Sequence, residues 1–336
     1  MRRNLIFLLL LCVGYLPVLA QDLSEEEVKK LMTDAFMQNQ AGKHQEALDG
    51  FLKVGLNTKR QRTEDERKVY VCSQTMAVMC YESLGKYEEG FRLSEKLLNG
   101  NINDEERKDL HHLYVVNGYF VATSYIHKSN RRYAEARELF EKILPFADDD
   151  MRQRILPKIP LAWYFEGTLF QLEQKYGEAL ACMEKARDGF HEIGETKNEI
   201  EAWCQIGSIK NFTYFPKEAM AAYEAACGLL ASAKYDKKLM EILREQRKLS
   251  EQLGDSKQTL SISQRMDSLA AATDDNQVRF AYYNYLGDVA KEQGNYKLSE
   301  QWYRKNDAYI SQLGNDYKGA DKYLYYSNLR NLFAKA

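Results

Sequence analysis

The sequence predicts an all-α protein, an α-solenoid of stacked antiparallel helix pairs, and three observations lead to this prediction. The chain has 336 residues but only 5 Pro, whereas about 5% Pro is usual. One short phrase that ends on a small residue recurs along the chain, and bulky residues follow it on one helical face. Hydrophobic residues make up 45% and charged residues 29% of the chain, which excludes a disordered chain and a polytopic membrane protein.

The recurring phrase, called the turn phrase below, places a short turn before a small residue. One clear copy is Gln174-Lys175-Tyr176-Gly177-Glu178-Ala179, and a weaker copy spans 254–259. The last residue of the phrase falls at positions 47, 90, 136, 179, 219, 259 and 299, in steps of 43, 46, 43, 40, 40 and 40. A period of this length indicates stacked helical units.

Each unit is predicted to consist of a helix A, a tight turn and a helix B. Tyr223 and Ala226 follow Ala219 by four and seven positions, which places the three on one helical face. On helix A, a large residue stands four before a small one, as Trp163 does before Gly167. The small residues let the helices approach closely. The predicted packing set is Ala47, Gly90, Ala136, Trp163, Gly167, Ala179, Trp203, Gly207, Ala219, Gly287 and Ser299.

These residues resemble the tetratricopeptide repeat (TPR). The best match to that motif is Trp163, Gly167, Phe170, Tyr176, Ala179, Met183 and Ala186. The period exceeds the usual one of about 34 residues, and it looks like the long-helix version in bacterial signalling proteins. The resemblance covers residue 24 to the end, with repeats 1 and 6 departing from the pattern. It implies a right-handed superhelix with a concave groove lined by helix A.

The first twenty residues are interpreted as a signal peptide. Arg2 and Arg3 precede an uncharged apolar run, and Val18 and Ala20 stand before Gln21 as a cleavage site would require. The run is shorter than the ~20 apolar residues of a spanning helix. We therefore expect cleavage after Ala20 and an exported, most simply periplasmic, protein.

The repeats divide the remaining chain. Residues 24–145 are predicted to hold repeats 1–3, and 161–312 to hold repeats 4–7. Between them, 146–160 is predicted as an irregular connection containing Pro157 and Pro160, either a bend between two subarrays or a longer loop. Residues 313–336 are predicted as a final helix, which is either a cap or the first half of an eighth repeat.

Charge and cysteine content argue against two further classes of protein, nucleic-acid-binding proteins and disulfide-stapled domains. Lys+Arg is 47 against 49 Asp+Glu, without the basic excess of a nucleic-acid-binding protein. Five Cys follow the leader, an odd number that does not suggest a disulfide framework, although a bridge between Cys182 and Cys204 is left open.

No catalytic, cofactor-binding or metal-binding residues are predicted. The sequence has no G-x-x-x-x-G-K-[ST], G-x-G-x-x-G, H-E-x-x-H or G-x-S-x-G motif. His111 and His112 are adjacent, so on a helix they point about 100° apart. Asp148, Asp149 and Asp150 are interpreted as a solvated loop that caps or precedes a helix.

The expected function is an exported, non-enzymatic scaffold that binds a protein or peptide, without nucleic acid or a small-molecule cofactor. The alternative is a periplasmic sensor region of a membrane-bound signalling protein, a histidine kinase or transcriptional regulator, whose output domain lies outside this chain. Membrane attachment is expected only through an uncleaved leader or a missing C-terminal segment. The groove positions of helix A are Met79, Glu82, Tyr125, Lys128, Tyr164, Thr168, Gln171, Ser208, Asn211, Asn284, Asp288 and Lys291.

Overall fold

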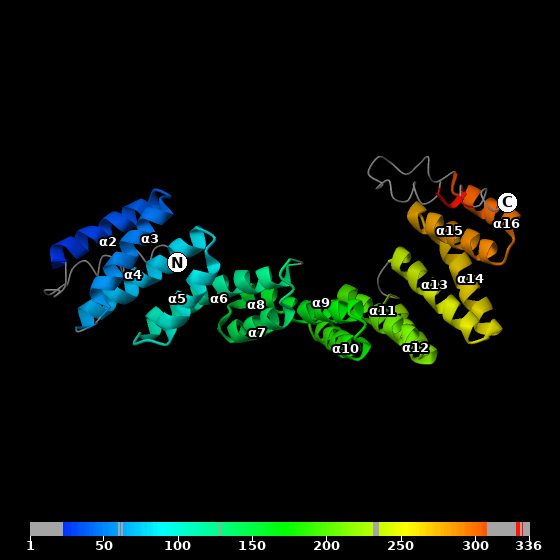
Figure 1. The fold of residues 1–336 in the computed structure, drawn as a ribbon, viewed down its shortest axis with the longest axis horizontal. Coiled ribbons are helices and arrows are strands. Elements are labelled where there is room, and N and C mark those ends of the chain that lie inside the picture. The colour runs from blue at the N-terminus through cyan, green and yellow to red at the C-terminus, as the bar shows by residue number, and fades with distance from the viewer. Residues whose placement is uncertain are drawn as a thin grey trace. The chain divides into compact units, whose positions relative to one another are not determined.

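The computed structural model describes residues 23–59, 61, 63–127, 129–230, 235–307, 327–329 and 331. Within these residues the secondary structure is helical and contains no strand. The predicted all-α fold class is therefore confirmed, and its elements follow one another as antiparallel helix pairs (Figure 1).

Seven helix pairs are found in the described part of the chain. The A helices are α2 (Glu25–Gln40), α4 (Glu64–Ser83), α6 (Asp104–Ile126), α9 (Lys158–Leu172), α11 (Thr196–Phe212), α13 (Asp236–Gln252) and α15 (Asn276–Glu292). The B helices are α3 (His44–Thr58), α5 (Tyr87–Leu98), α7 (Tyr133–Ile143), α10 (Tyr176–Glu192), α12 (Pro216–Leu230), α14 (Ser256–Ala272) and α16 (Tyr296–Arg304). Each A helix packs against the B helix that follows it.

The chain divides into two compact units, residues 1–194 and 195–336. The described helices α2 to α10 belong to the first unit, and α11 to α16 belong to the second. In the second unit the A helices begin at Thr196, Asp236 and Asn276, a constant step of 40 residues. The predicted connection at 146–160 lies inside the first unit and does not separate the two.

The starts of α2 and α6 are stabilised by local capping chemistry. Ser24 and Asn103 precede α2 and α6, and each forms a capping box with the Glu three residues later. These caps satisfy backbone N–H groups that have no partner inside the helix. Arg67 and Glu106, both buried, then join α4 to α6 through an ion pair of 2.7 Å between Nη1 and Oε2.

The A–B turns contain a residue in the left-handed region of backbone conformation. Four of these residues are glycines, Gly42, Gly85, Gly254 and Gly294, with φ between 69° and 78°. A side chain is disfavoured in this region, so the glycines of the turn phrase are explained by backbone geometry. The remaining three turns hold Arg131, Gln174 and Tyr214 at positive φ.

Small residues in the packing set lie at close helix–helix contacts. Every glycine, alanine and serine in the set is buried, whereas Trp163 and Trp203 are half-buried. A Cβ at Gly207 would lie 2.9 Å from the Tyr223 ring. At Gly287 a Cβ would overlap the ring of Tyr303.

Trp163 also lies between two cations. The Arg137 guanidinium lies 3.3 Å and the Lys185 ammonium 4.1 Å from the ring centroid. Glu166 pairs with Arg137 at 2.6 Å, so this tryptophan links α7, α9 and α10 in the first unit.

Most of the interval 146–160 is helical, which corrects the prediction of an irregular connection. It follows the 3₁₀ turn η1 (Leu144–Phe146) and contains α8 (Asp149–Ile155). Asp148 caps α8 by accepting the Met151 N–H at 2.9 Å, and Met151 and Ile155 bury against a core that includes Phe140. Pro160 lies in the first turn of α9, where no internal N–H bond is lost.

The two ends of the chain lie largely outside the described residues. This applies to the whole predicted signal peptide, 1–20, and to all of the predicted final helix except residues 327–329 and 331, which are helical. Among the described helices, none combines the length and apolar character that crossing a membrane requires.

Candidate protein-binding surface

The groove positions of the first unit lie on three A helices. Met79 and Glu82 are on α4, Tyr125 is on α6, and three residues are on α9. All of these side chains are half-buried, and Lys128 lies outside the described residues. The α9 residues are Tyr164, Thr168 and Gln171.

Several of these side chains already have partners within the unit. The Arg132 guanidinium lies 3.8 Å from the centroid of the Tyr125 ring. The Thr168 hydroxyl donates to the carbonyl of Tyr164 at 2.9 Å. Burial raises the pKa of the Glu82 carboxyl, and the nearby His112 acts in the opposite direction. The predicted positions in this unit therefore do not form a set of free polar groups.

In the second unit the predicted positions differ in accessibility. Ser208 on α11 is exposed, whereas Asn211 and Lys291 are half-buried. Asp288 accepts a hydrogen bond of 2.6 Å from the Tyr303 hydroxyl of α16. Asn284 is buried, with 7% of its surface exposed, so it does not lie on an open surface as predicted groove residues were expected to do.

Asn284 nevertheless has an unusual feature. Its Oδ1 atom is buried and has no hydrogen-bond partner among the described residues. On α13, which packs against α15, the Nε of Arg244 is in the same condition. The Arg244 guanidinium lies 5.0 Å from the ring centroid of Tyr285, the residue next to Asn284. An unmatched donor and an unmatched acceptor therefore occur on neighbouring A helices.

Arg244 was missed by the sequence analysis, which left repeat 6 out of the predicted groove. A signal was present, because Arg244 and Asn284 are 40 residues apart and occupy equivalent positions in helices of equal length. The weak turn phrase of repeat 6, with Ser256 and Thr259 at its key positions, obscured this register.

Two other buried polar atoms without partners, in the amides of Asn117 and Gln74, have a different setting. The amide of Asn117 packs against Gly90, where a Cβ would lie 2.5 Å from its Oδ1. The amide of Gln74 packs in the same way against Gly55. Each of these two amides lies between an A helix and a B helix and fills the space left by a glycine that has no side chain. Arg244 and Asn284 instead lie on two successive A helices.

The charge around Arg244 is also distinctive. Arg247 pairs with Glu251 at 2.8 Å, and Lys248 pairs with Glu245 at 2.9 Å. Arg244 forms no ion pair within the described part of the chain. Its guanidinium charge is therefore not balanced by a carboxylate of these helices.

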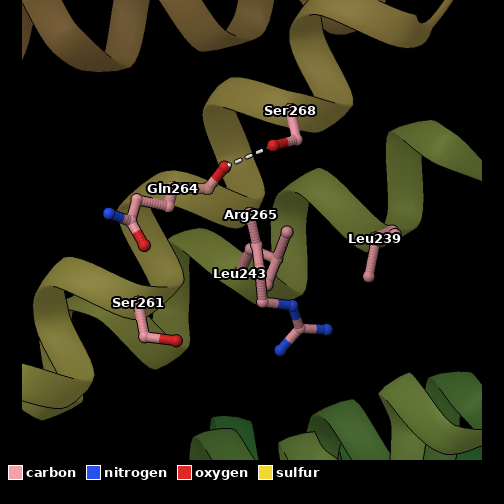
Figure 2. A pocket seen from close by; sticks show the side chains of 6 residues that line it. All are labelled: Leu239, Leu243, Ser261, Gln264, Arg265 and Ser268. Carbon is pink, nitrogen blue, oxygen red and sulfur yellow. Dashed lines mark hydrogen bonds between the residues drawn. The ribbon is translucent and has the colours of Figure 1, made fainter.

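A shallow pocket of about 340 Å³ lies on α13 and α14 (Figure 2). Leu239 and Leu243 of α13 line it together with Ser261, Gln264, Arg265 and Ser268 of α14. The Ser268 hydroxyl donates to the Gln264 carbonyl within α14. Arg265 is exposed, which makes it a useful comparison for the buried Nε of Arg244.

A larger cleft of about 660 Å³ lies between the first half of α6 and the segment leading into α8. His111 packs on Phe146 with ring centroids 4.5 Å apart, and His112 lies 3.4 Å from Asp148. Burial, followed by the nearby Arg107, lowers the pKa of His111. Among the described residues, no three His, Cys, Asp or Glu side chains are placed to hold a metal ion.

The cysteines do not form the bridge that the sequence left open. Cys182 and Cys204 are both free thiols. Burial is the main cause that raises the pKa of Cys182 to about 11 and that of Cys204 to about 12. Such thiols are protonated near neutral pH and are poor nucleophiles.

Comparison with known proteins shows likeness in fold. No family model and no curated protein matches the sequence. Several solved structures show partial similarity, each with a TM-score below 0.5. One is the C-terminal part of a TPR repeat-containing protein from Cytophaga hutchinsonii, with 12% identity, 84% of this chain and 96% of that chain covered, and a TM-score of 0.39.

Two further structures show the same level of likeness. The Rap conjugation gene regulator of plasmid pLS20, solved with the Phr* peptide, has 14% identity, coverage of 91% and 83%, and a TM-score of 0.37. BtubC from P. vanneervenii has 13% identity, coverage of 67% and 90%, and a TM-score of 0.36. These similarities concern the helical-repeat fold alone.

Proposed function

We propose that the chain is a non-enzymatic helical-repeat scaffold that binds a protein or peptide segment on the A helices of its second unit. The segment would lie across α13 and α15, and the side chains of Arg244 and Asn284, whose unpartnered atoms are buried in the free chain, would turn outward to meet it. Export to the periplasm, expected from residues 1–20, is part of this proposal. A periplasmic sensor region of a larger signalling protein would use the same surface.

The observation that carries the proposal is the pair of buried, unpartnered atoms. A buried polar atom without a partner costs about 1–3 kcal/mol, and nearly all such atoms in folded proteins are paired. Arg244 Nε can donate and Asn284 Oδ1 can accept a hydrogen bond. A peptide backbone presents one acceptor and one donor per residue, so an extended segment can satisfy both.

The charge on Arg244 indicates which chemical group the bound segment should carry. Because neighbouring cations already have carboxylate partners, Arg244 is the group left to receive an acidic side chain or a terminal carboxylate. Hydrogen bonds to charged groups contribute about 1.5–3 kcal/mol. We therefore expect bound segments to carry a carboxylate next to the backbone that reaches Asn284.

The experiment is a selection of peptides that bind the purified chain from a random library, followed by titration calorimetry. Substitution Arg244→Ala should weaken the selected peptides by roughly tenfold or more, because it removes a charge-assisted hydrogen bond. Peptides in which the acidic residue is replaced by its amide should lose affinity for the wild-type chain but not for Arg244→Ala.

The matched control is Arg265→Ala, which removes an exposed arginine of the same unit (Figure 2). It should leave the affinity unchanged. Selected peptides that bind Arg244→Ala as tightly as the wild type would contradict the proposed site, and failure of the library to yield any binder would contradict the proposed function.

A further inference from the structure

The turn between α11 and α12 presents three aromatic side chains to solvent. Phe212 is 64% exposed, Tyr214 91% and Phe215 51%. These three residues are called the aromatic turn below. Large aromatic side chains exposed together are unusual on a soluble domain and indicate an interaction site.

The backbone of the aromatic turn makes Tyr214 an unfavourable choice for structure alone. Tyr214 has φ of 66° and stands where Gly42, Gly85, Gly254 and Gly294 stand in four other A–B turns. A side chain is disfavoured in this conformation. An exposed aromatic residue in a strained position suggests a role outside the fold.

The aromatic turn is held in place by its own hydrogen bonds. The Thr213 hydroxyl donates to the Ile209 carbonyl at 2.8 Å. The N–H groups of Tyr214 and Phe215 donate to the carbonyls of Asn211 and Lys210 at 3.1 and 2.8 Å. The aromatic rings are thus carried on an ordered turn, so little additional ordering would be needed on binding.

Two lysines flank the aromatic turn. The Lys210 ammonium lies 5.5 Å from the ring centroid of Phe215, and Lys217 is exposed in the first turn of α12. Neither lysine forms an ion pair within the described part of the chain. The single carboxylate in segment 208–218 is Glu218, so the segment has a net positive charge.

We propose that the aromatic turn inserts into the interfacial region of a bilayer that contains anionic phospholipid. A tyrosine ring such as that of Tyr214, with its polar hydroxyl, favours the headgroup level of a membrane, and unpaired lysines are attracted to anionic headgroups. A protruding apolar tip with cations beside it fits a fluid anionic surface better than the groove of a protein. This is an attachment through the folded repeats, beyond the leader or missing segment that the sequence suggested.

The test is flotation of the chain, from Gln21 onward, with two kinds of vesicle. One contains phosphatidylethanolamine and phosphatidylglycerol, and the other contains phosphatidylcholine alone. We expect flotation with the first kind, weakened by salt. Substitution Tyr214→Gly should reduce binding by about tenfold without loss of folding, because glycine suits the backbone. Lys210→Gln with Lys217→Gln should abolish the preference for phosphatidylglycerol.

The matched control is Gln174→Gly, which makes the same backbone change at φ of 62° in another A–B turn without removing an aromatic ring. Its flotation should equal that of the wild type. Equal flotation of Tyr214→Gly and wild type would overturn the proposal. Absence of flotation by the wild type would also overturn it. If Tyr214→Gly then lost binding to a protein partner, the aromatic turn would be a protein-binding surface instead.

Discussion

At the scale of single residues, the small side chains of the A helices decide how closely helices pack. Gly207 and Gly287 face the rings of Tyr223 and Tyr303 at distances that a methyl group cannot occupy. The sequence predicted these positions because a small residue recurs at a fixed distance from a bulky one. It could not predict that Asn284 is buried, since exposure depends on how α13 packs against α15.

The glycines allow a direct test of this packing. Gly207→Ala should destabilise the second unit by about 1–3 kcal/mol, because the new Cβ would lie 2.9 Å from the Tyr223 ring. Gly228→Ala, on α12 with open space around it, should instead stabilise by up to about 1 kcal/mol. Calorimetric melting of both variants checks the expectation, and a melting temperature for Gly207→Ala equal to or above that of Gly228→Ala would contradict it.

At the scale of elements, the A–B pairs were predictable, but helix α8 was not. The turn phrase contains both the turn and the start of helix B, so each pair has its own sequence signal. In contrast, the segment 146–160 contains Pro157 and Pro160, which suggested that the helical repeats are interrupted there. Seven residues are too few for a recognisable helical period, and only the Asp148 cap indicated that a helix begins there.

Glu82 gives a pH test at the same scale, since it lies on α4 near His112 of α6. Burial, only partly opposed by His112, raises its pKa above the usual 4.5, so the folded chain holds this proton more tightly than the unfolded chain. Its contribution to stability is therefore greatest in acid and falls as the pH rises through and above 4.5.

In the Glu82→Gln variant the melting temperature should fall less as the pH rises, because the variant lacks the carboxyl whose ionisation destabilises the folded chain. The exposed Glu89→Gln serves as the control and should keep the wild-type pH profile. The comparison is made by calorimetry from below pH 4.5 to neutral pH. A profile for Glu82→Gln that is parallel to that of the wild type would show that burial does not perturb this carboxyl.

At the scale of the whole molecule, the repeat count was predictable and the division into two units was not. The spacing nevertheless carried a signal, because the step between small residues becomes a constant 40 from Ala179 onward. The compact units separate at Gly194 and Glu195, within that first regular step. The prolines drew attention to 146–160 instead, although that segment is integrated into the first unit by α8.

The candidate site was only partly predictable, for a physical reason. The register identified helix A as the surface, and with it Asn284. It did not identify Arg244, because the weak turn phrase of repeat 6 hid the equivalent position. Whether a polar atom has a partner depends on side-chain packing between helices, which periodicity alone does not show.

The most direct test of the proposed binding surface is one variant, Asn284→Leu, examined by two measurements. If Asn284 Oδ1 is kept unpaired for a ligand, an apolar side chain of similar size should raise the melting temperature of the free chain. The same variant should bind the selected peptides roughly tenfold more weakly. A lower melting temperature together with unchanged affinity would show that Asn284 serves the fold, and would contradict the account.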